Sequence, residues 1–322
     1  MLFKVFIESF HESCDSSRLD SFMRVNVVAM VILSRGKCGL CKCVTYYLIG
    51  MAGVDLSVVI FDLILRHIPI VFREQFEFVL HIPMCNIHSA LLYAATDCSV
   101  WLTVTFTFDR YVAIGCKRLK QKYCPEKTAA VVLGTVTFLS CSIDIYWYFI
   151  LAGPYWRGNQ PWFCHVPIKD MLSVVWGTIE FLHYILTPGV PFVLIMLLNV
   201  FTLRHFLVSN RDRKRLRAHS CGESTRDPEV ANRRKPMILL FVISANLIIL
   251  WSVIMLFSIR TRMYYQGYEA MYLHWFVQEM GFMLQLLSCC TNTCIYAVTQ
   301  TKFRDELKNV FKCRFLRQSY DE

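Results

Sequence analysis

Charged residues are scarce in this chain of 322 residues. Asp, Glu, Lys and Arg together make up 18% of it, while hydrophobic residues make up 55%. A soluble domain usually carries about a quarter charged residues. With a mean hydropathy of +0.41 and 14% aromatic residues, the composition excludes an ordinary soluble enzyme, a disordered chain, collagen and a secreted disulfide scaffold.

Several sequence motifs are also missing. No Asn-x-Ser/Thr sequon occurs, so we predict no N-glycan. Lys4 and Glu8 interrupt the opening apolar stretch, so no cleavable signal peptide is visible. The chain has no His-Glu-x-x-His motif, no paired aspartates that suggest an intramembrane hydrolase, and no internal repeat of the transporter kind. We therefore expect no enzyme.

Six apolar blocks are long enough to cross about 30 Å of hydrocarbon as helices. They cover residues 45–65, 85–114, 128–151, 172–208, 237–259 and 271–298. A seventh block, 21–33, is short and contains Arg24, and segment 11–20 before it is polar where apolar residues are expected. We predict an all-α membrane protein, a seven-transmembrane helix bundle with an atypically short first helix. The polar segment before the first helix suggests that residues 1–24 come from an alternative first exon. We then expect the chain to insert poorly into the membrane.

Basic residues orient the bundle. Segments 34–44, 110–127, 204–235 and 302–322 hold 25 of the 34 Lys and Arg residues, whereas the alternate segments 66–84, 152–171 and 260–270 hold 6. Positive residues favour the cytoplasmic side, so we expect the N-terminus outside and the C-terminus inside. The net charge of +10 then points to a cytoplasmic partner and anionic membrane lipids, with no nucleic acid.

Polar residues inside the apolar blocks are functional candidates, because they are costly in a membrane. Asp55 lies in the middle of its block, Asp97 and Ser99 lie in the next, and Asn292 with Ser288 lies in the last. Their oxygens could surround a hard cation such as Na⁺. The alternative is a hydrogen-bonded packing device.

A series of landmarks runs along the chain in a fixed order. It consists of Asn26, Asp55, Cys85, Asp109-Arg110-Tyr111, Pro191, Trp251, Asn292-Thr293-Cys294-Ile295-Tyr296 and Phe303-Arg304. Over residues 26–313 the chain resembles a rhodopsin-type (class A) G-protein-coupled receptor, and more narrowly it is similar to the orphan group of the receptor numbered 139, whose members are proposed to sense aromatic amino acids. The resemblance implies a short amphipathic eighth helix.

The resemblance implies roles for these landmarks. Arg110 would be held by Asp109 at rest and released, beside Tyr111, to meet a heterotrimeric G protein. The switch would also involve Pro191, Trp251, Asn292 and Tyr296. Asp55, Ser99 and Asn292 match an allosteric sodium site, and we expect no other cofactor. Cys85 and Cys164 match the family's loop disulfide. The chain departs from the family at Val253 and Thr293, where proline is usual, and at Asn199, where tyrosine is usual.

The resemblance also implies an extracellular ligand, a small molecule such as an aromatic amino acid, or a peptide. The candidate ligand-binding residues are His88, Leu92, Tyr93, Thr96, His183, Tyr184, Ile254, Gln278, Glu279 and Phe282. Leu92 replaces the aspartate of amine receptors, and the seventh helix has no lysine for retinal. His183 matches an agonist-contacting histidine of the orphan group and fits a buried packing histidine equally well. Ile254 replaces that group's arginine.

Four other cysteines have more than one possible role. Cys313 is a candidate palmitoylation site or a free thiol. Cys38, Cys41 and Cys43 could form a zinc cluster, although a fourth ligand is not evident.

We divide the chain into an atypical extracellular N-terminus (1–20), a receptor domain (21–300) and a tail with the eighth helix (301–322), in the plasma membrane. The competing function is a transporter or proton-coupled channel that relays through Asp55, Asp97 and Glu279. Asp109-Arg110-Tyr111, which a relay does not need, favours the receptor.

Overall fold

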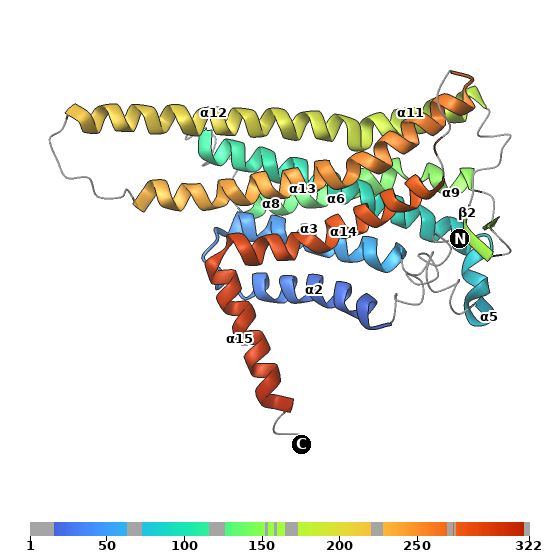
Figure 1. Cartoon of the computed structure of the whole chain (residues 1–322), viewed down its shortest axis with the longest axis horizontal. Coiled ribbons are helices and arrows are strands. Elements are labelled where there is room, and N and C mark those ends of the chain that lie inside the picture. Colours follow the sequence, from blue (N-terminus) through green and yellow to red (C-terminus); the bar gives the residue numbers. More distant parts are fainter. Residues whose placement is uncertain are drawn as a thin grey trace.

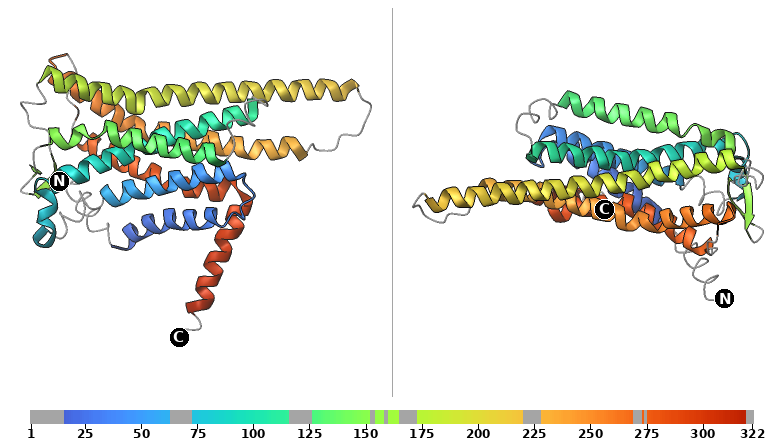
Figure 2. Two further views of the ribbon diagram at one scale, coloured as in Figure 1. Left: turned by 180° about the vertical axis from the view of Figure 1, so that it is seen from behind. Right: turned by 90° about the horizontal axis from the view of Figure 1, so that it is seen from above.

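The computed structural model describes residues 16–62, 73–115, 126–151, 154–157, 160–164, 173–219, 228–268, 273 and 275–318. Within these ranges, long helices run side by side as a bundle (Figure 1, Figure 2). The long helices are α2 (Ser16–Ser34), α3 (Lys42–Asp62), α6 (Met84–Gly115), α8 (Glu126–Ile143), α12 (Val190–His219), α13 (Pro228–Tyr265), α14 (Trp275–Thr299) and α15 (Thr301–Gln318). The shorter helices are α5 (Arg73–Phe76), η2 (Glu77–Leu80), α9 (Tyr146–Ile150), α11 (Val174–Tyr184) and η3 (Ile185–Gly189).

The predicted spans are present. Six segments of the described chain are long and apolar enough to cross a membrane: Lys42–Asp62, Met84–Gly115, Lys127–Ile150, Val174–Asp212, Met237–Tyr265 and Phe276–Thr299. The first helix extends upstream to Ser16, while its apolar part is limited to Met23–Ser34. The helix is thus longer than the apolar pattern indicates, but its apolar part is short, as predicted.

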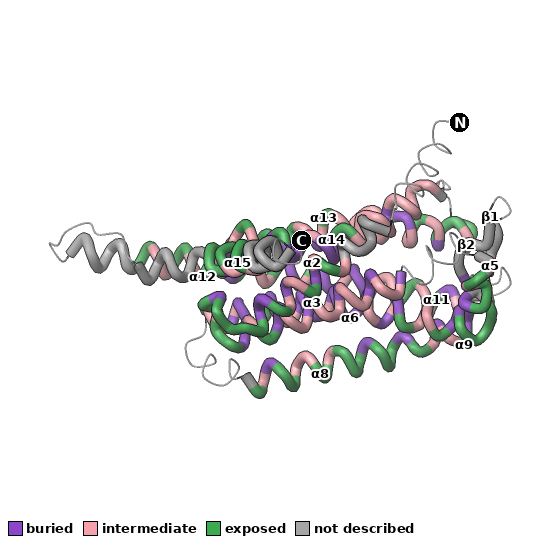
Figure 3. The backbone as a smooth tube through the Cα atoms, turned by 90° about the horizontal axis from the view of Figure 1, so that it is seen from below, coloured by how far each residue is buried: buried purple, intermediate pink, exposed green. Residues whose placement is uncertain are grey.

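The surface of α8 indicates its surroundings. Only 17% of the most apolar stretch within Lys127–Ile150 is buried inside the bundle. The side chains of Phe138 and Val131 are 70% and 66% exposed. Figure 3 shows this helix at the edge of the bundle with much of its length exposed. Such an apolar outer face suits contact with lipid chains and would be unstable in water.

Two of the predicted single helices are interrupted. The predicted block 128–151 breaks between Ile143 and Tyr146, so that α8 and α9 flank Asp144. The predicted block 172–208 contains the π-helical turn η3, in which Thr187 has non-helical dihedral angles (φ −142°, ψ 110°) next to Pro188. Proline cannot donate a backbone hydrogen bond and clashes with the preceding turn. The distortion therefore lies at Pro188, just before the predicted landmark Pro191.

A small hairpin covers one end of the bundle, and the sequence analysis did not predict it. Strand β1 (Pro154–Arg157) pairs antiparallel with β2 (Gln160–Cys164). The predicted disulfide Cys85–Cys164 is present and joins β2 to the first turn of α6. At the opposite end, α12 and α13 project past the other helices and α15 leaves the bundle at an angle (Figure 1).

Candidate functional site

The Asp109-Arg110-Tyr111 triplet lies in the last two turns of α6, at the end from which α12 and α13 project. Asp109 and Arg110 are only 4% and 7% exposed. Arg110 Nε donates to Asp109 Oδ2 at 2.9 Å, and Arg110 Nη2 forms an ion pair with the same oxygen. The ring of Tyr111 lies 6.3 Å from that of Phe201 on α12.

Neighbouring helices complete the environment of this ion pair. Cys43 Sγ on α3 donates to Asp109 Oδ1 at 3.3 Å, and the Arg110 guanidinium carbon lies 6.0 Å from the centroid of the Phe106 ring. A buried charge is stable only when it is paired. Arg110 can therefore leave Asp109 only if another acceptor or water replaces it.

The three residues predicted to bind sodium meet between α3, α6 and α14. The carboxylate of Asp55 is fully buried and accepts hydrogen bonds from Ser99 Oγ and Asn292 Nδ2, both at 2.7 Å. Carboxylate, hydroxyl and amide groups are donor types suited to a hard cation. The Ser99 oxygen and the Asp55 carboxylate are in place, and Asn292 would turn its amide to offer its oxygen.

Asp97 does not join this cluster, although the sequence analysis considered it there. Residues two positions apart on a helix point about 200° apart, so Asp97 and Ser99 face opposite sides of α6. Asp55 contacts Ser99, Asn292 and Cys289. Asp97 instead faces Asp144 and His183. Among the described contacts, nothing connects Asp55 to Asp97 as the predicted relay requires.

Trp251 lies in a buried apolar cluster between α6, α12 and α13. It is 3% exposed and belongs to a group that includes Val104, Phe192 and Leu247. Pro191, the neighbour of Phe192, is also buried. Helix α13 is continuous from Pro228 to Tyr265, in agreement with the absence of a proline at Val253.

Hydrogen bonds connect α14 to its neighbours near the predicted landmarks. Asn246 Nδ2 on α13 donates to Ser288 Oγ at 3.3 Å, and Thr291 Oγ1 donates to Asn246 Oδ1 at 3.0 Å. Thr293, which replaces the usual proline, donates to the backbone carbonyl of Val25 on α2 at 3.5 Å. The buried ring of Tyr296 packs on Phe303 of α15 at 6.0 Å between centroids.

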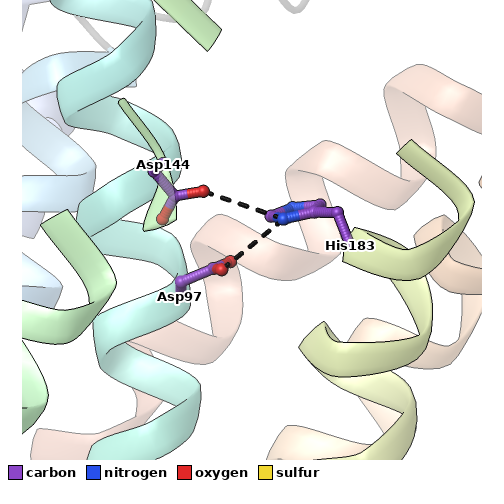
Figure 4. A group of neighbouring side chains, drawn as sticks. All are labelled: Asp97, Asp144 and His183. Carbon is purple, nitrogen blue, oxygen red and sulfur yellow. Dashed lines mark ion pairs between the residues drawn. The ribbon is translucent and has the colours of Figure 1, made fainter. Parts of the chain in front are cut away.

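Three of the predicted ligand-binding residues, Tyr93, His183 and Tyr184, belong to an aromatic cluster in the outer half of the bundle. The rings of Tyr93 and Trp147 stack at 4.0 Å, and His183 lies edge-on to Trp147 at 5.5 Å. His183 Nδ1 lies 3.7 Å from Asp97 Oδ2 and 3.7 Å from Asp144 Oδ1. Figure 4 shows both carboxylates directed at this ring. The sequence analysis missed Asp144, although a carboxylate inside the apolar block 128–151 was a signal for it.

The other predicted ligand-binding residues have different surroundings. Leu92 packs with buried residues such as Val58 and Cys289, away from the aromatic cluster. His88 Nδ1 is 2.9 Å from the carbonyl of Met84 one turn earlier. The half-buried members are Thr96, Ile254, Gln278, Glu279 and Phe282.

Tyr184 belongs to a polar contact between α11 and α13 that the sequence analysis missed. Its hydroxyl donates to Glu180 at 3.5 Å, and Arg262 forms an ion pair with Glu180 at 3.0 Å. A Cβ atom at Gly177 would overlap Arg262 Nη2 and lie 3.0 Å from its guanidinium carbon, so the glycine leaves room for the arginine. The signal was Arg262, which lies just after the predicted block 237–259.

The three cysteines near the inner loop do not form a metal site in the described chain. Cys43 contacts Asp109, while the thiol of Cys38 lies 3.8 Å from the carbonyl of Ile32 and Cys41 is exposed. Burial, and secondarily the negative charge of Glu306, raises the pKa of the Cys38 thiol. The side chain of Cys313 lies outside the described part.

Comparison with known families identifies a match over most of the chain. The family described as 7 transmembrane receptor (rhodopsin family) matches residues 25–296. The matched region contains each of the landmarks from Asn26 to Tyr296.

Proposed function

Because the chain belongs to the rhodopsin family of seven-transmembrane receptors, we propose that it transmits the binding of an extracellular ligand to a heterotrimeric G protein. Signalling as a multi-pass membrane receptor is the function of the family. The receptor catalyses no covalent chemistry in this proposal. The observation that carries it is the buried Asp109–Arg110 ion pair at the inner end of α6.

The ion pair suits a two-state switch. In the resting state Arg110 binds Asp109, and in the active state it would turn to an acceptor on the G protein. A buried charge with two alternative partners allows small changes at the ligand site to shift the population of the two states. The inner face carries 25 of the 34 basic residues, which supports a cytoplasmic orientation of this end in the plasma membrane, with the N-terminus outside. The basic inner face would also attract anionic lipids.

The test needs no known agonist. Asp109→Asn keeps the side-chain shape but removes the negative charge that holds Arg110, so we expect basal nucleotide exchange to rise about 5–150-fold, the usual range of such couplings. Adding Arg110→Ala should abolish the increase, whereas Arg304→Ala, at an exposed position of α15, should leave it intact. Exchange is measured as GTP-analogue binding in membranes with equal surface receptor. Unchanged exchange in Asp109→Asn contradicts the proposed switch.

The sodium site is a second part of the proposal. Asp55, Ser99 and Asn292 would hold the ion, and sodium would supply positive charge that stabilises the resting packing of α3, α6 and α14. The full burial of Asp55 and its two short hydrogen bonds support this role. Sodium that favours the resting state must weaken agonist binding by the same factor.

The ligand proposed is an aromatic amino acid or a peptide with an aromatic residue. The rings of Tyr93, Trp147 and Tyr184 around His183 support an aromatic partner. Tryptophan and phenylalanine are the first probes, with nucleotide exchange as the readout. A response in the wild type that His183→Ala lowers supports this ligand class, and an unchanged potency would assign His183 to packing.

A further inference from the structure

Three buried side chains from separate elements converge in the outer half of the bundle. They are Asp97 on α6, Asp144 in the turn between α8 and α9, and His183 on α11 (Figure 4). Their side chains are 6%, 0% and 7% exposed. One donor atom from each lies within 4.8 Å of the other two, and the described part of the chain contains no second group of His, Cys, Asp and Glu with this geometry.

These groups have weaker partners than buried polar atoms normally have. Nδ1 of His183 and both carboxylate oxygens of Asp144 make no well-formed hydrogen bond within the described part of the chain, and the contacts of Nδ1 to the two carboxylates are long, at 3.7 Å. Burying a carboxylate without a partner costs several kcal/mol. A buried polar group without a good hydrogen-bond partner is rare in a folded protein, and a bound ion is one explanation for it. Thr187 and Trp147 are neutral hydrogen-bond donors close to Asp97 and Asp144 respectively, and neither supplies the positive charge that would neutralise two carboxylates.

We propose that Asp97, Asp144 and His183 form a binding site for a divalent transition-metal ion, with Zn²⁺ the best fit. One imidazole nitrogen and two carboxylate oxygens form a mixed donor set that Zn²⁺ accepts in tetrahedral geometry. Ca²⁺ and Mg²⁺ require six or more oxygen ligands, which three residues do not supply. Two carboxylates also balance the charge of a divalent ion.

The spacing of the donor atoms favours a metal over an organic cation. Ligands about 2.1 Å from a tetrahedral metal lie about 3.4 Å apart, whereas acceptors about 2.8 Å from an ammonium nitrogen lie about 4.6 Å apart. The observed separation of His183 Nδ1 from each carboxylate is 3.7 Å. To bind a metal, Nδ1 and each carboxylate oxygen would have to approach each other by about 0.3 Å. To bind an ammonium group, they would have to move apart by about 0.9 Å.

The site would join three elements that are otherwise separate in sequence. The ion would connect α6 and α11 with the turn at Asp144, where the fourth helix is interrupted. This interruption lets Asp144 reach the site while α8 continues along the lipid. Three protein ligands leave the fourth position of a tetrahedral ion for water or for a donor atom of a ligand.

Zinc binding to the purified full-length chain tests this proposal. We expect ZnCl₂ at about 100 times its Kd to raise the thermal midpoint by roughly 5–10 °C. The wild type and His205→Ala, which changes an exposed histidine in the middle of α12, should both respond. Asp144→Asn and His183→Gln should lose at least ~100-fold in zinc affinity, while Asp144→His, which keeps a ligand atom, should retain binding. The readout does not depend on signalling, so its failure is distinct from failure of the proposed function.

A second measurement keeps the test decisive if a variant does not fold. Co²⁺ added to the wild type should give the visible absorption of a tetrahedral nitrogen and oxygen site, without a thiolate charge-transfer band. A thiolate band would place the metal on cysteines and overturn the assignment. An equal response to Ca²⁺ or Mg²⁺, a response to phenethylammonium but not to zinc, or no zinc response in the wild type would overturn it as well.

Discussion

Replacing Gly281 by alanine should separate two helices that are in close contact. Gly281 is buried on α14, and a Cβ atom there would lie 2.9 Å from both Cα and Cβ of Ile254 and 3.1 Å from its backbone nitrogen. Ordinary contacts at a Cβ atom are 3.4–4 Å. Because two of the three atoms belong to the backbone of α13, no side-chain rotation can relieve the clash. The helices must move apart by about 0.5–1 Å, and such overpacking costs about 1–3 kcal/mol.

The assay is thermal unfolding of the purified chain, followed by intrinsic fluorescence. A loss of about 1–3 kcal/mol corresponds to a decrease of roughly 2–10 °C in Tm. Gly134→Ala is the matched control, because Gly134 is exposed on α8 and a Cβ atom there meets nothing within 4 Å. This control should not lower Tm. If Gly281→Ala melts with the wild type, the contact between α13 and α14 is not as close as the structure indicates.

Three further predictions concern single sites. Gly177→Ala should displace the guanidinium of Arg262 and break its ion pair with Glu180, lowering Tm by a few degrees; equal melting of Gly177→Ala and the wild type would contradict this. Sodium should lower basal nucleotide exchange several-fold in the wild type but not in Asp55→Asn, and sodium sensitivity of the variant would refute the site. Maleimide should label exposed Cys41 before Cys38, whose raised pKa keeps its thiolate fraction low until the pH increases; equal labelling rates at pH 7 would contradict it.

The spans could be predicted because membrane thickness requires long apolar helices, and the six predicted blocks correspond to the six apolar spans of the structure. The first helix differs because its start, from Ser16, is polar. A search for long apolar stretches cannot find the polar residues at the start of this helix, before Met23, even though they are helical.

The breaks in the fourth and fifth helices were not predicted for a similar reason. A hydropathy pattern averages over Asp144 and Pro188, which are single residues in apolar blocks. Asp144 is explained only when its spatial neighbours Asp97 and His183 are known. The sequence placed these three residues in separate blocks and could not indicate that their donor atoms converge.

The convergence of Asp55, Ser99 and Asn292 was predicted from the family resemblance, and helix periodicity alone explains why Asp97 lies elsewhere. The contact between Glu180 and Arg262 was missed because it depends on the room left by Gly177. Such a contact requires the relative placement of α11 and α13, which no local pattern specifies.

The hydrogen bond from Thr293 to Val25 has a consequence for the timing of synthesis. The two residues are 268 positions apart, and a ribosome adds about 5–20 residues per second. The bond from α14 to the first helix, whose apolar part is only Met23–Ser34, therefore forms about 15–50 s after that helix is made. During that interval the partner of the first helix is α3, whose Tyr47 and Leu48 share a buried cluster with Ile32, so we expect retention of the first helix in the membrane to depend on α3 before α14 exists.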